Sequence, residues 1–136
     1  DISNMALRQS QQRLGDRAHL IHWKVADLLS VEFEPETYQV WHDRAVFHFL
    51  TQPKEQKSYI QQVKTAVQPL GYVIVATFAE DGPVQCSGLE VQRYSIAQLQ
   101  QQFAEPDFRL VTSVQNMHIT PNGQVQKFNY VMFQKQ

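Results

Sequence analysis

The chain has 136 residues and a formal net charge of −1, with 43% hydrophobic and 18% charged residues. This is the size of one domain, and eight Phe, five Tyr and two Trp can build a core, which excludes a disordered chain. Twelve basic against thirteen acidic residues argue against nucleic acid as a partner, and no apolar run is long enough to predict a membrane span. We therefore interpret residues 1–136 as a single domain.

The first part of the chain predicts a helix and then a short strand. Ser3 can cap a helix whose apolar positions recur as far as Leu14, and Gly15 is a typical stop signal. Residues 20–25 are apolar and rich in strand-favouring types, so we expect a strand there. A second strand is expected over 38–43.

The middle of the chain predicts a helix followed by a buried strand. Apolar residues recur at helical spacing over 54–68, and Pro69 and Gly71 are expected to end this helix. Residues 71–78 are continuously apolar instead of alternating, so both faces of this strand should be covered, as in a parallel sheet flanked by helices.

The last part predicts a capped helix and an antiparallel hairpin. Ser95 and Gln98 have capping-box spacing at the start of the helix. Two alternating strands follow, the second over 125–133, with a turn at 121–123 between them. The residues expected on one face of the first strand are Phe108, Leu110, Thr112 and Val114. The overall order of elements predicts an α/β architecture.

Several short stretches in this order carry a resemblance. They are Asp1-Ile2-Ser3 before a helix, residues 23–28, and the run Trp41-His42-Asp43-Arg44-Ala45-Val46-Phe47-His48-Phe49-Leu50; the tail adds residues 86–89, 93–94 and 118–123. With them the chain resembles the class I S-adenosylmethionine-dependent methyltransferases of the small-molecule type. The resemblance implies a Rossmann-like sheet of strand order 3-2-1-4-5-7-6, parallel except for a C-terminal antiparallel hairpin.

The resemblance also implies a set of cofactor-binding residues. Asp1 would accept hydrogen bonds from the ribose hydroxyls, and Ile2 would cover one face of the adenine. Asp27, with Leu28, would lie beside the adenine amino group, and Asp43 would lie near the methionine part or the substrate. The cofactor implied is S-adenosylmethionine.

The residues expected to bind the substrate come from the run 41–50 and from the tail of the chain. Arg44 and His48 could face the substrate cleft, with His48 as a general base because its ordinary pKa is near neutrality. Arg93, Tyr94 and His118 could hold an anionic substrate. Three of these residues have a structural alternative: His48 as a boundary histidine on an apolar helix, Tyr94 as a packing residue and His118 as the end of a strand.

The function expected from the resemblance is methyl transfer to a small-molecule acceptor. The family's first strand and glycine-rich loop should precede Asp1, so we expect an N-terminally truncated domain. The alternative is a non-catalytic remnant that forms a homodimer through an unpaired sheet edge. The His42-Asp43 pair also occurs in metal-dependent phosphohydrolases, but that family is helical and this pair ends a strand, so no metal is expected. The single cysteine, Cys86, excludes an intramolecular disulfide and predicts a reducing, cytoplasmic location.

Overall fold

The computed structural model describes residues 1–103 and 106–136. These residues form two compact units, residues 1–32 and residues 33–136, which are described separately.

The first unit consists of one helix, one 3₁₀-helix and an extended tail. Helix α1 (Asn4–Leu14) begins at Ser3, whose hydroxyl accepts a hydrogen bond from the Ala6 amide, and ends at Gly15, which has φ +56°. The predicted cap and stop are therefore both confirmed. A 3₁₀-helix (Gly15–Leu20) follows, and the indole of Trp23 donates a 2.9 Å hydrogen bond to the carbonyl of Ala18.

The strand predicted at residues 20–25 is wrong. Leu20 ends the 3₁₀-helix and the segment after it has no strand assignment. One pairing of strand type remains, because the backbone nitrogen of Asp1 donates to the carbonyl of Lys24 and the amide of Ala26 donates to the carbonyl of Asp1. Bonds from one residue to those on either side of Val25 are the pattern of a parallel pair. The apolar residues of 20–25 favour a strand, but among the described residues the structure shows no strand pairing there beyond the one between Asp1 and Val25.

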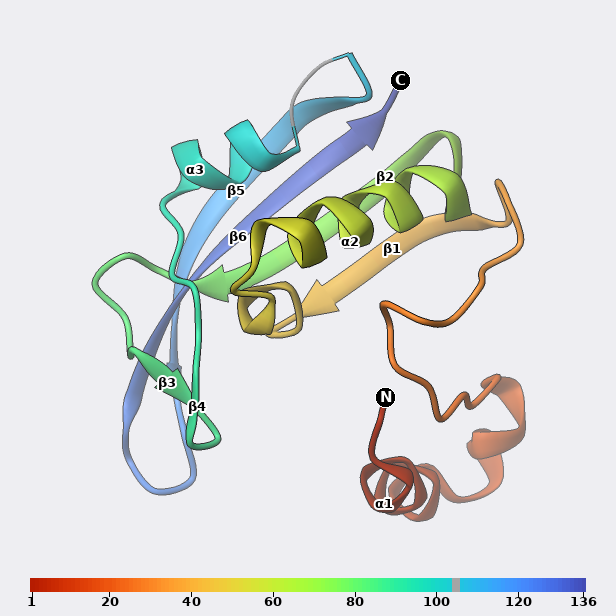
Figure 1. Ribbon diagram of the computed structural model, residues 1–136. Coiled ribbons are helices and arrows are strands. Elements are labelled where there is room, and N and C mark those ends of the chain that lie inside the picture. The colour runs from red at the N-terminus through yellow and green to blue at the C-terminus, as the bar shows by residue number, and fades with distance from the viewer. Residues whose placement is uncertain (104–105) are drawn as a thin grey trace. The chain divides into compact units, whose positions relative to one another are not determined.

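The second unit is built on a four-stranded sheet (Figure 1). Its strands are β1 (Tyr38–Arg44), β2 (Val67–Phe78), β5 (Phe108–Ile119) and β6 (Val125–Lys135), in the spatial order β1-β2-β6-β5. The β1–β2 pair is parallel, and the β2–β6 and β6–β5 pairs are antiparallel. A separate small hairpin pairs β3 (Gln85–Cys86) with β4 (Leu89–Glu90). The predicted mixed α/β sheet with a C-terminal antiparallel hairpin is thus confirmed.

Two α-helices and a 3₁₀-helix complete the second unit. Helix α2 (Pro53–Ala66) starts with a capping box between Gln52 and Glu55, and α3 (Ile96–Gln102) has the predicted box between Ser95 and Gln98. The 3₁₀-helix is Phe47–Phe49. Helix α2 ends at Ala66 and β2 begins at the next residue, earlier than the predicted stop. Figure 1 shows α2 and α3 on the same side of the sheet.

Aromatic rings fill the space between this side of the sheet and the helices. Phe47 stacks on Tyr94 with 5.4 Å between ring centroids, and Phe103 stacks on Phe133 at 5.0 Å. Tyr59 of α2 lies 4.9 Å from Phe47. All five rings are buried, so this layer is the main hydrophobic core and fixes the helices on the sheet.

The opposite face of the sheet is covered only near the carboxyl end of β2. There Ala76, Phe78 and Phe128 are buried, while Cys86 and Val91 of the β3–β4 region pack against them. Further along the same face, Tyr72, Val40 and Val114 are exposed. Within this unit, helices cover one face of β2, and the β3–β4 region covers the other face near Ala76 and Phe78.

A bulge in β5 also corrects the predicted face of that strand. Leu110 pairs with Phe133, but Thr112 pairs with Met132, because the register shifts by one residue at Val111. Phe108 and Leu110 consequently lie on the helix side, whereas Thr112 and Val114 lie on the other side. The turn predicted at 121–123 is confirmed, with Gly123 at φ +78°.

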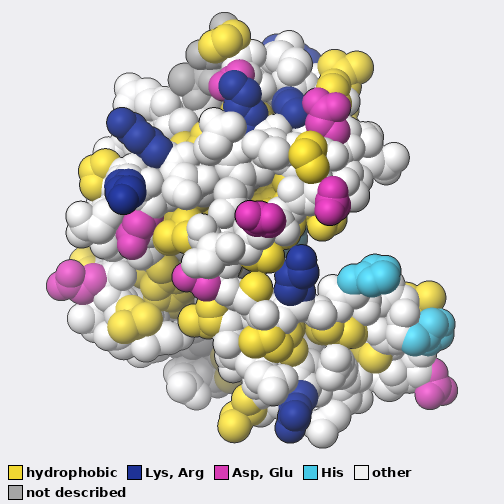
Figure 2. Space-filling view, turned by 45° about the vertical axis from the view of Figure 1, so that its right-hand side comes forward, with side chains coloured by type: hydrophobic (Ala, Val, Ile, Leu, Met, Phe, Trp, Pro, Cys, Tyr) yellow, Lys and Arg dark blue, Asp and Glu magenta, His cyan; other side chains and the backbone are white. Residues whose placement is uncertain are grey.

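The surface carries charged side chains of both signs. Figure 2 shows Lys and Arg side chains interspersed with Asp and Glu over the face that it displays. Among the described residues, no helix combines the length and the apolar character that a membrane crossing needs.

Candidate functional site

The carboxyl end of β1 is fixed by one buried carboxylate, Asp43. Its Oδ1 accepts a 2.8 Å hydrogen bond from the amide of Val46, and its Oδ2 accepts a 2.9 Å bond from the amide of Phe47. The hydroxyl of Tyr59 donates a third bond of 2.7 Å to Oδ2. These bonds cap the 3₁₀-helix and hold Ala45 in a left-handed conformation with φ +66°.

Burial shapes the ionisation of this group. Asp43 is only 5% exposed, and desolvation raises the pKa of its carboxyl, although the three hydrogen bonds act in the opposite direction. The pKa of the Tyr59 hydroxyl is raised well above its usual value by burial and by the neighbouring Asp43. The indole of Trp41 donates a 2.9 Å hydrogen bond to the Tyr59 oxygen. Asp43 therefore lies within the protein's own hydrogen-bond network and anchors the turn.

His48 lies in the 3₁₀-helix and is fully buried. Its Nδ1 accepts a 3.4 Å hydrogen bond from the amide of Phe78, and its ring packs against Phe49 and Phe78. Nε2 has no hydrogen-bond partner among the described residues. Burial lowers the pKa of the imidazole to about 4, so the ring is neutral at physiological pH. The structure therefore places His48 in the core and not at a boundary.

Arg44 is exposed on the face of the sheet opposite the helices. Its Nε donates a 2.9 Å hydrogen bond to the hydroxyl of Tyr130, and its guanidinium carbon lies 4.7 Å from the centre of the Phe128 ring. Both partners belong to β6, two strands away. Sequence reasoning missed this arrangement, because 86 residues separate Arg44 from Tyr130 and no local pattern relates them.

In the first unit, Asp1 and Asp27 lie at the ends of two adjoining segments. The backbone bonds of Asp1 to residues 24 and 26 place it beside Val25, and Asp27 follows two residues later. Oδ1 of Asp1 accepts from the amide of Ser3, and Oδ1 of Asp27 accepts from the amide of Leu29. Both aspartates are exposed, and Oδ2 of Asp27 accepts a 3.4 Å hydrogen bond from the hydroxyl of Ser30. Ile2 is 75% exposed and Leu28 is half-buried.

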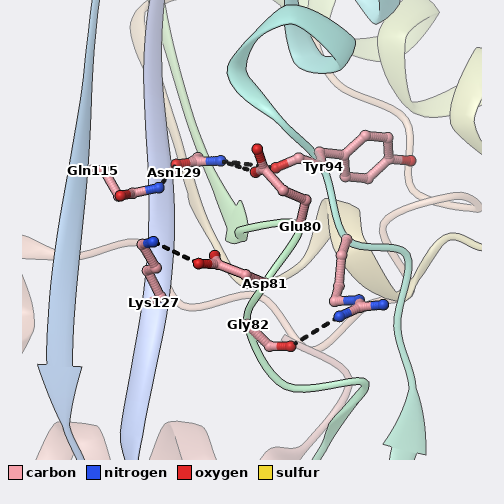
Figure 3. A network of polar contacts seen from close by, with 8 residues as sticks. Glu80, Asp81, Gly82, Tyr94, Gln115, Lys127 and Asn129 are labelled. Atoms are coloured by element: carbon pink, nitrogen blue, oxygen red, sulfur yellow. Dashed lines mark hydrogen bonds and ion pairs between the residues drawn. The ribbon is translucent and has the colours of Figure 1, made fainter.

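A second polar network connects the loop after β2 to the β5–β6 hairpin (Figure 3). Asn129 of β6 is buried; its Nδ2 donates to the carbonyl of Tyr94 at 2.8 Å and to Glu80 at 3.2 Å. Its Oδ1 accepts a 3.0 Å bond from Gln115 of β5. Lys127, two residues before Asn129, forms a 2.6 Å ion pair with Asp81, and this pairing lowers the pKa of that carboxyl.

An open cavity of about 510 Å³ lies beside this loop. The β3–β4 hairpin and the starts of α2 and α3 form its other sides. Its charged lining groups are Glu80, Glu90 and Arg93, and the remainder are three Gln, two Val and one Thr. Val91 lines this cavity and also packs against the Ala76–Phe78–Phe128 cluster, so it borders both regions.

The three predicted substrate residues do not share one surface. Arg93 lines the cavity and donates a 3.1 Å hydrogen bond to the carbonyl of Gly82. Tyr94 is buried, with its pKa raised to about 12 by desolvation, and stacks on Phe47. His118 pairs with Gln126 in the hairpin and lies on the same sheet face as Phe128, because Asn116, two residues before it, pairs with Phe128. His118 is thus on the face that bears Arg44.

The acidic and histidine side chains do not cluster as metal ligands. Among residues 1–103 and 106–136, no group of three His, Cys, Asp or Glu side chains could hold a metal ion. His42 and Asp43 lie on opposite faces of β1, since adjacent strand residues alternate.

Comparison with solved structures reveals the fold. A SAM-dependent methyltransferase from Methanosarcina mazei matches 99% of this chain with a TM-score of 0.77 at 14% identity. The N-methyltransferase NodS from Bradyrhizobium japonicum WM9 matches 99% with a TM-score of 0.73 at 14% identity. This chain has the class I methyltransferase fold. The β1-β2-β6-β5 sheet matches the 4-5-7-6 part of the strand order that the resemblance implied.

A third similar structure carries ligands. It is the Burkholderia thailandensis 1,6-didemethyltoxoflavin-N1-methyltransferase with 1,6-didemethyltoxoflavin and S-adenosylhomocysteine, matched over 98% of this chain with a TM-score of 0.70 at 15% identity. The chain spans 79%, 70% and 57% of the lengths of the three matched proteins, in the order given. No family model and no curated protein matches the sequence.

Proposed function

We propose that this protein takes part in S-adenosylmethionine-dependent methyl transfer to a small-molecule acceptor. The observation that carries the proposal is the pairing of Asp1 with Val25, which places two exposed carboxylates, Asp1 and Asp27, at the ends of adjoining extended segments. Ligands of open α/β sheets bind beyond the carboxyl ends of the strands, which is where such carboxylates are needed.

The residues of the first unit fit the nucleoside part of the cofactor. The Asp1 carboxylate has free acceptor positions besides the one used by the Ser3 amide, so it can accept hydrogen bonds from two ribose hydroxyls. Ile2 offers an exposed apolar side chain for one face of the adenine. Asp27 and the backbone near Leu28 would form hydrogen bonds with the edge of the adenine. When bound, S-adenosylmethionine supplies a methyl group that its sulfonium already activates.

The chain's own residues would contribute orientation and exclusion of water more than proton transfer. Asp43 holds the turn after β1 through three hydrogen bonds, so we assign it a positioning role and not direct contact with the cofactor. His48 is fully buried and neutral, and we do not assign it the role of a base. Arg44 remains available to a ligand on the exposed face.

Titration calorimetry with S-adenosylhomocysteine tests this proposal. We expect saturable binding, and a loss of about tenfold in affinity on Asp1→Asn or Asp27→Asn, since hydrogen bonds to a charged acceptor contribute roughly 1.5–3 kcal/mol each. Asp16→Asn is the matched control, because Asp16 is also an exposed aspartate of the first unit. Absence of heat at millimolar ligand, or equal affinity in all three variants, would contradict the proposal.

A second candidate is association of two copies without catalysis. It is favoured by β1, an edge strand of the described sheet whose Val40 is 53% exposed, since an unpaired strand edge can pair with another chain. Light scattering across a range of protein concentrations tests it. A dimer that forms without any affinity for S-adenosylhomocysteine would favour this candidate, and a monomeric mass at every concentration would eliminate it.

A further inference from the structure

Arg44 crosses a neighbouring strand to reach its partners. It pairs with Ala76 in the β1–β2 register, and Ala76 pairs with Tyr130 in the β2–β6 register, so the three residues form one row across the sheet. Strands are about 4.8 Å apart, so the backbones of Arg44 and Tyr130 are separated by about 10 Å, and the arginine and tyrosine side chains bridge this distance together. The small side chain of Ala76 leaves room for it. The row therefore holds a long cationic side chain flat against the sheet.

The guanidinium is oriented but electrically unpaired. The hydroxyl of Tyr130 accepts from Nε at 2.9 Å, and the Phe128 ring lies beneath the guanidinium carbon at 4.7 Å. Within residues 1–103 and 106–136, neither terminal nitrogen of Arg44 has a hydrogen-bond partner, and no carboxylate forms an ion pair with it. By contrast, Arg93 and Arg109 each donate through a terminal nitrogen to the protein. A guanidinium whose two terminal nitrogens are both available can donate two parallel hydrogen bonds to one carboxylate.

The surroundings combine polar and apolar groups. Cys86 and Val91 pack against the cluster of Ala76, Phe78 and Phe128 and remain partly accessible. The register places Asn116 and His118 on the same face of the hairpin, next to Phe128. A ligand that reaches the guanidinium would meet apolar side chains on one flank and hydrogen-bonding groups on the other.

We propose that Arg44, oriented by Tyr130 and Phe128, binds the carboxylate of the methyl acceptor, which is an organic acid with an apolar or aromatic body. This inference rests on the proposed function and names the substrate class of that site. A single uncompensated positive charge balances a monoanion, and the flank formed by Cys86 and Val91 suits an apolar body better than the hydrated shell of an inorganic ion.

Benzoate is the probe for this site. We expect it to shift the Nε–Hε resonance of Arg44 and the backbone amide resonances of residues 128–130 saturably in NMR titrations of the whole chain; the amide resonances give the affinities of the Arg44 variants. Benzamide, its neutral counterpart, should bind at least about tenfold more weakly. Arg44→Gln should abolish the titration. Arg44→Lys, which keeps the charge but loses the fork, should weaken it about tenfold, and Tyr130→Phe should weaken it several-fold, because the fork is then less well oriented. Arg109→Gln, at the other end of the sheet, is the matched control and should leave benzoate affinity unchanged.

The outcomes separate this inference from the proposed function. No saturable shift, equal binding of benzamide, or unaltered affinity in Arg44→Lys would overturn the site. Displacement of benzoate by an equal concentration of inorganic phosphate would overturn the assignment to an organic acid. If S-adenosylhomocysteine binds while benzoate does not, only this inference fails. If benzoate binds at Arg44 while S-adenosylhomocysteine does not, the anion site stands and the proposed function fails.

Discussion

The hydroxyl of Tyr59 in α2 donates a 2.7 Å hydrogen bond to Oδ2 of Asp43 at the end of β1, and both residues are buried. The bond joins the helix layer to the end of β1, where Arg44 is the last residue. It also supplies one of three donors to a carboxylate that burial would otherwise leave in an apolar environment.

Replacing Tyr59 by Phe should lower the free energy of unfolding by about 2 kcal/mol, because a hydrogen bond to a buried carboxylate is lost and the Trp41 indole loses its acceptor. Urea denaturation measures this change. Tyr72→Phe is the control, since the Tyr72 side chain is exposed and should tolerate the loss of its hydroxyl. Equal effects of the two substitutions would contradict the assigned role of the Tyr59–Asp43 bond.

Ala45→Gly should leave the protein equally stable or stabilise it by up to about 1 kcal/mol. Ala45 has φ +66°, and glycine adopts this conformation without the steric cost that an L side chain carries. Ala45→Val should instead destabilise the protein by at least about 1 kcal/mol. Thermal unfolding of the pair provides the measurement, and a stabilising Val substitution would show that the turn is not constrained as described.

His48 should make the stability depend on pH between about 6.5 and 4. Its pKa is about 4 in the folded protein and near 6.5 when unfolded, so in this range the unfolded chain binds a proton that the folded protein does not. Stability is therefore full above pH 6.5 and falls as the pH drops toward 4, by up to about 3 kcal/mol. The raised pKa of Asp43 acts in the opposite sense, favouring the folded state at low pH.

The His48 contribution is isolated by the difference between the wild type and His48→Phe, because Asp43 is common to both. The free-energy difference between the two proteins should change with pH over this window, the wild type losing relative stability as the pH falls. A difference that is constant from pH 7 to pH 4.5 would contradict the burial of a neutral imidazole. Denaturant unfolding at several pH values gives the profile.

Asn129→Ala should lower the free energy of unfolding by roughly 2–3 kcal/mol, since it removes three hydrogen bonds and leaves buried polar groups without partners. The amides of 80–94 should also exchange hydrogen faster, because Asn129 ties this loop to β6 and β5. Asn116→Ala, an exposed position of β5, is the control. Unchanged exchange in the loop would show that other contacts hold it.

Local signals in the sequence were sufficient for most elements. Ser3 and Gly15 bound α1, and the Ser95–Gln98 box starts α3, because caps are decided by neighbouring residues. The strand expected at 20–25 does not form, since strand formation depends on partners that local composition does not reveal. The bulge at Val111 likewise depends on the register with β6 and moves Thr112 to the opposite face from Leu110.

The candidate site was predictable only where its parts are close in sequence. Asp43, Arg44 and His48 were singled out together, yet burial of Asp43 and His48 separates them from the exposed Arg44. The contacts of Arg44 with Phe128 and Tyr130 come from a register across three strands, which no spacing in the sequence encodes. Pairing of distant strands therefore decides which of the predicted residues remain available to a ligand.

The central claim is that this chain binds the cofactor through the carboxylates of its first unit. Mapping of amide chemical shifts during titration with S-adenosylhomocysteine tests it most directly. We predict saturable shifts centred on residues 2–3 and 25–29, with about tenfold weaker affinity in Asp27→Asn and unchanged affinity in Asp16→Asn. Shifts that are absent at millimolar ligand, or that leave these two segments unaffected, would contradict the account.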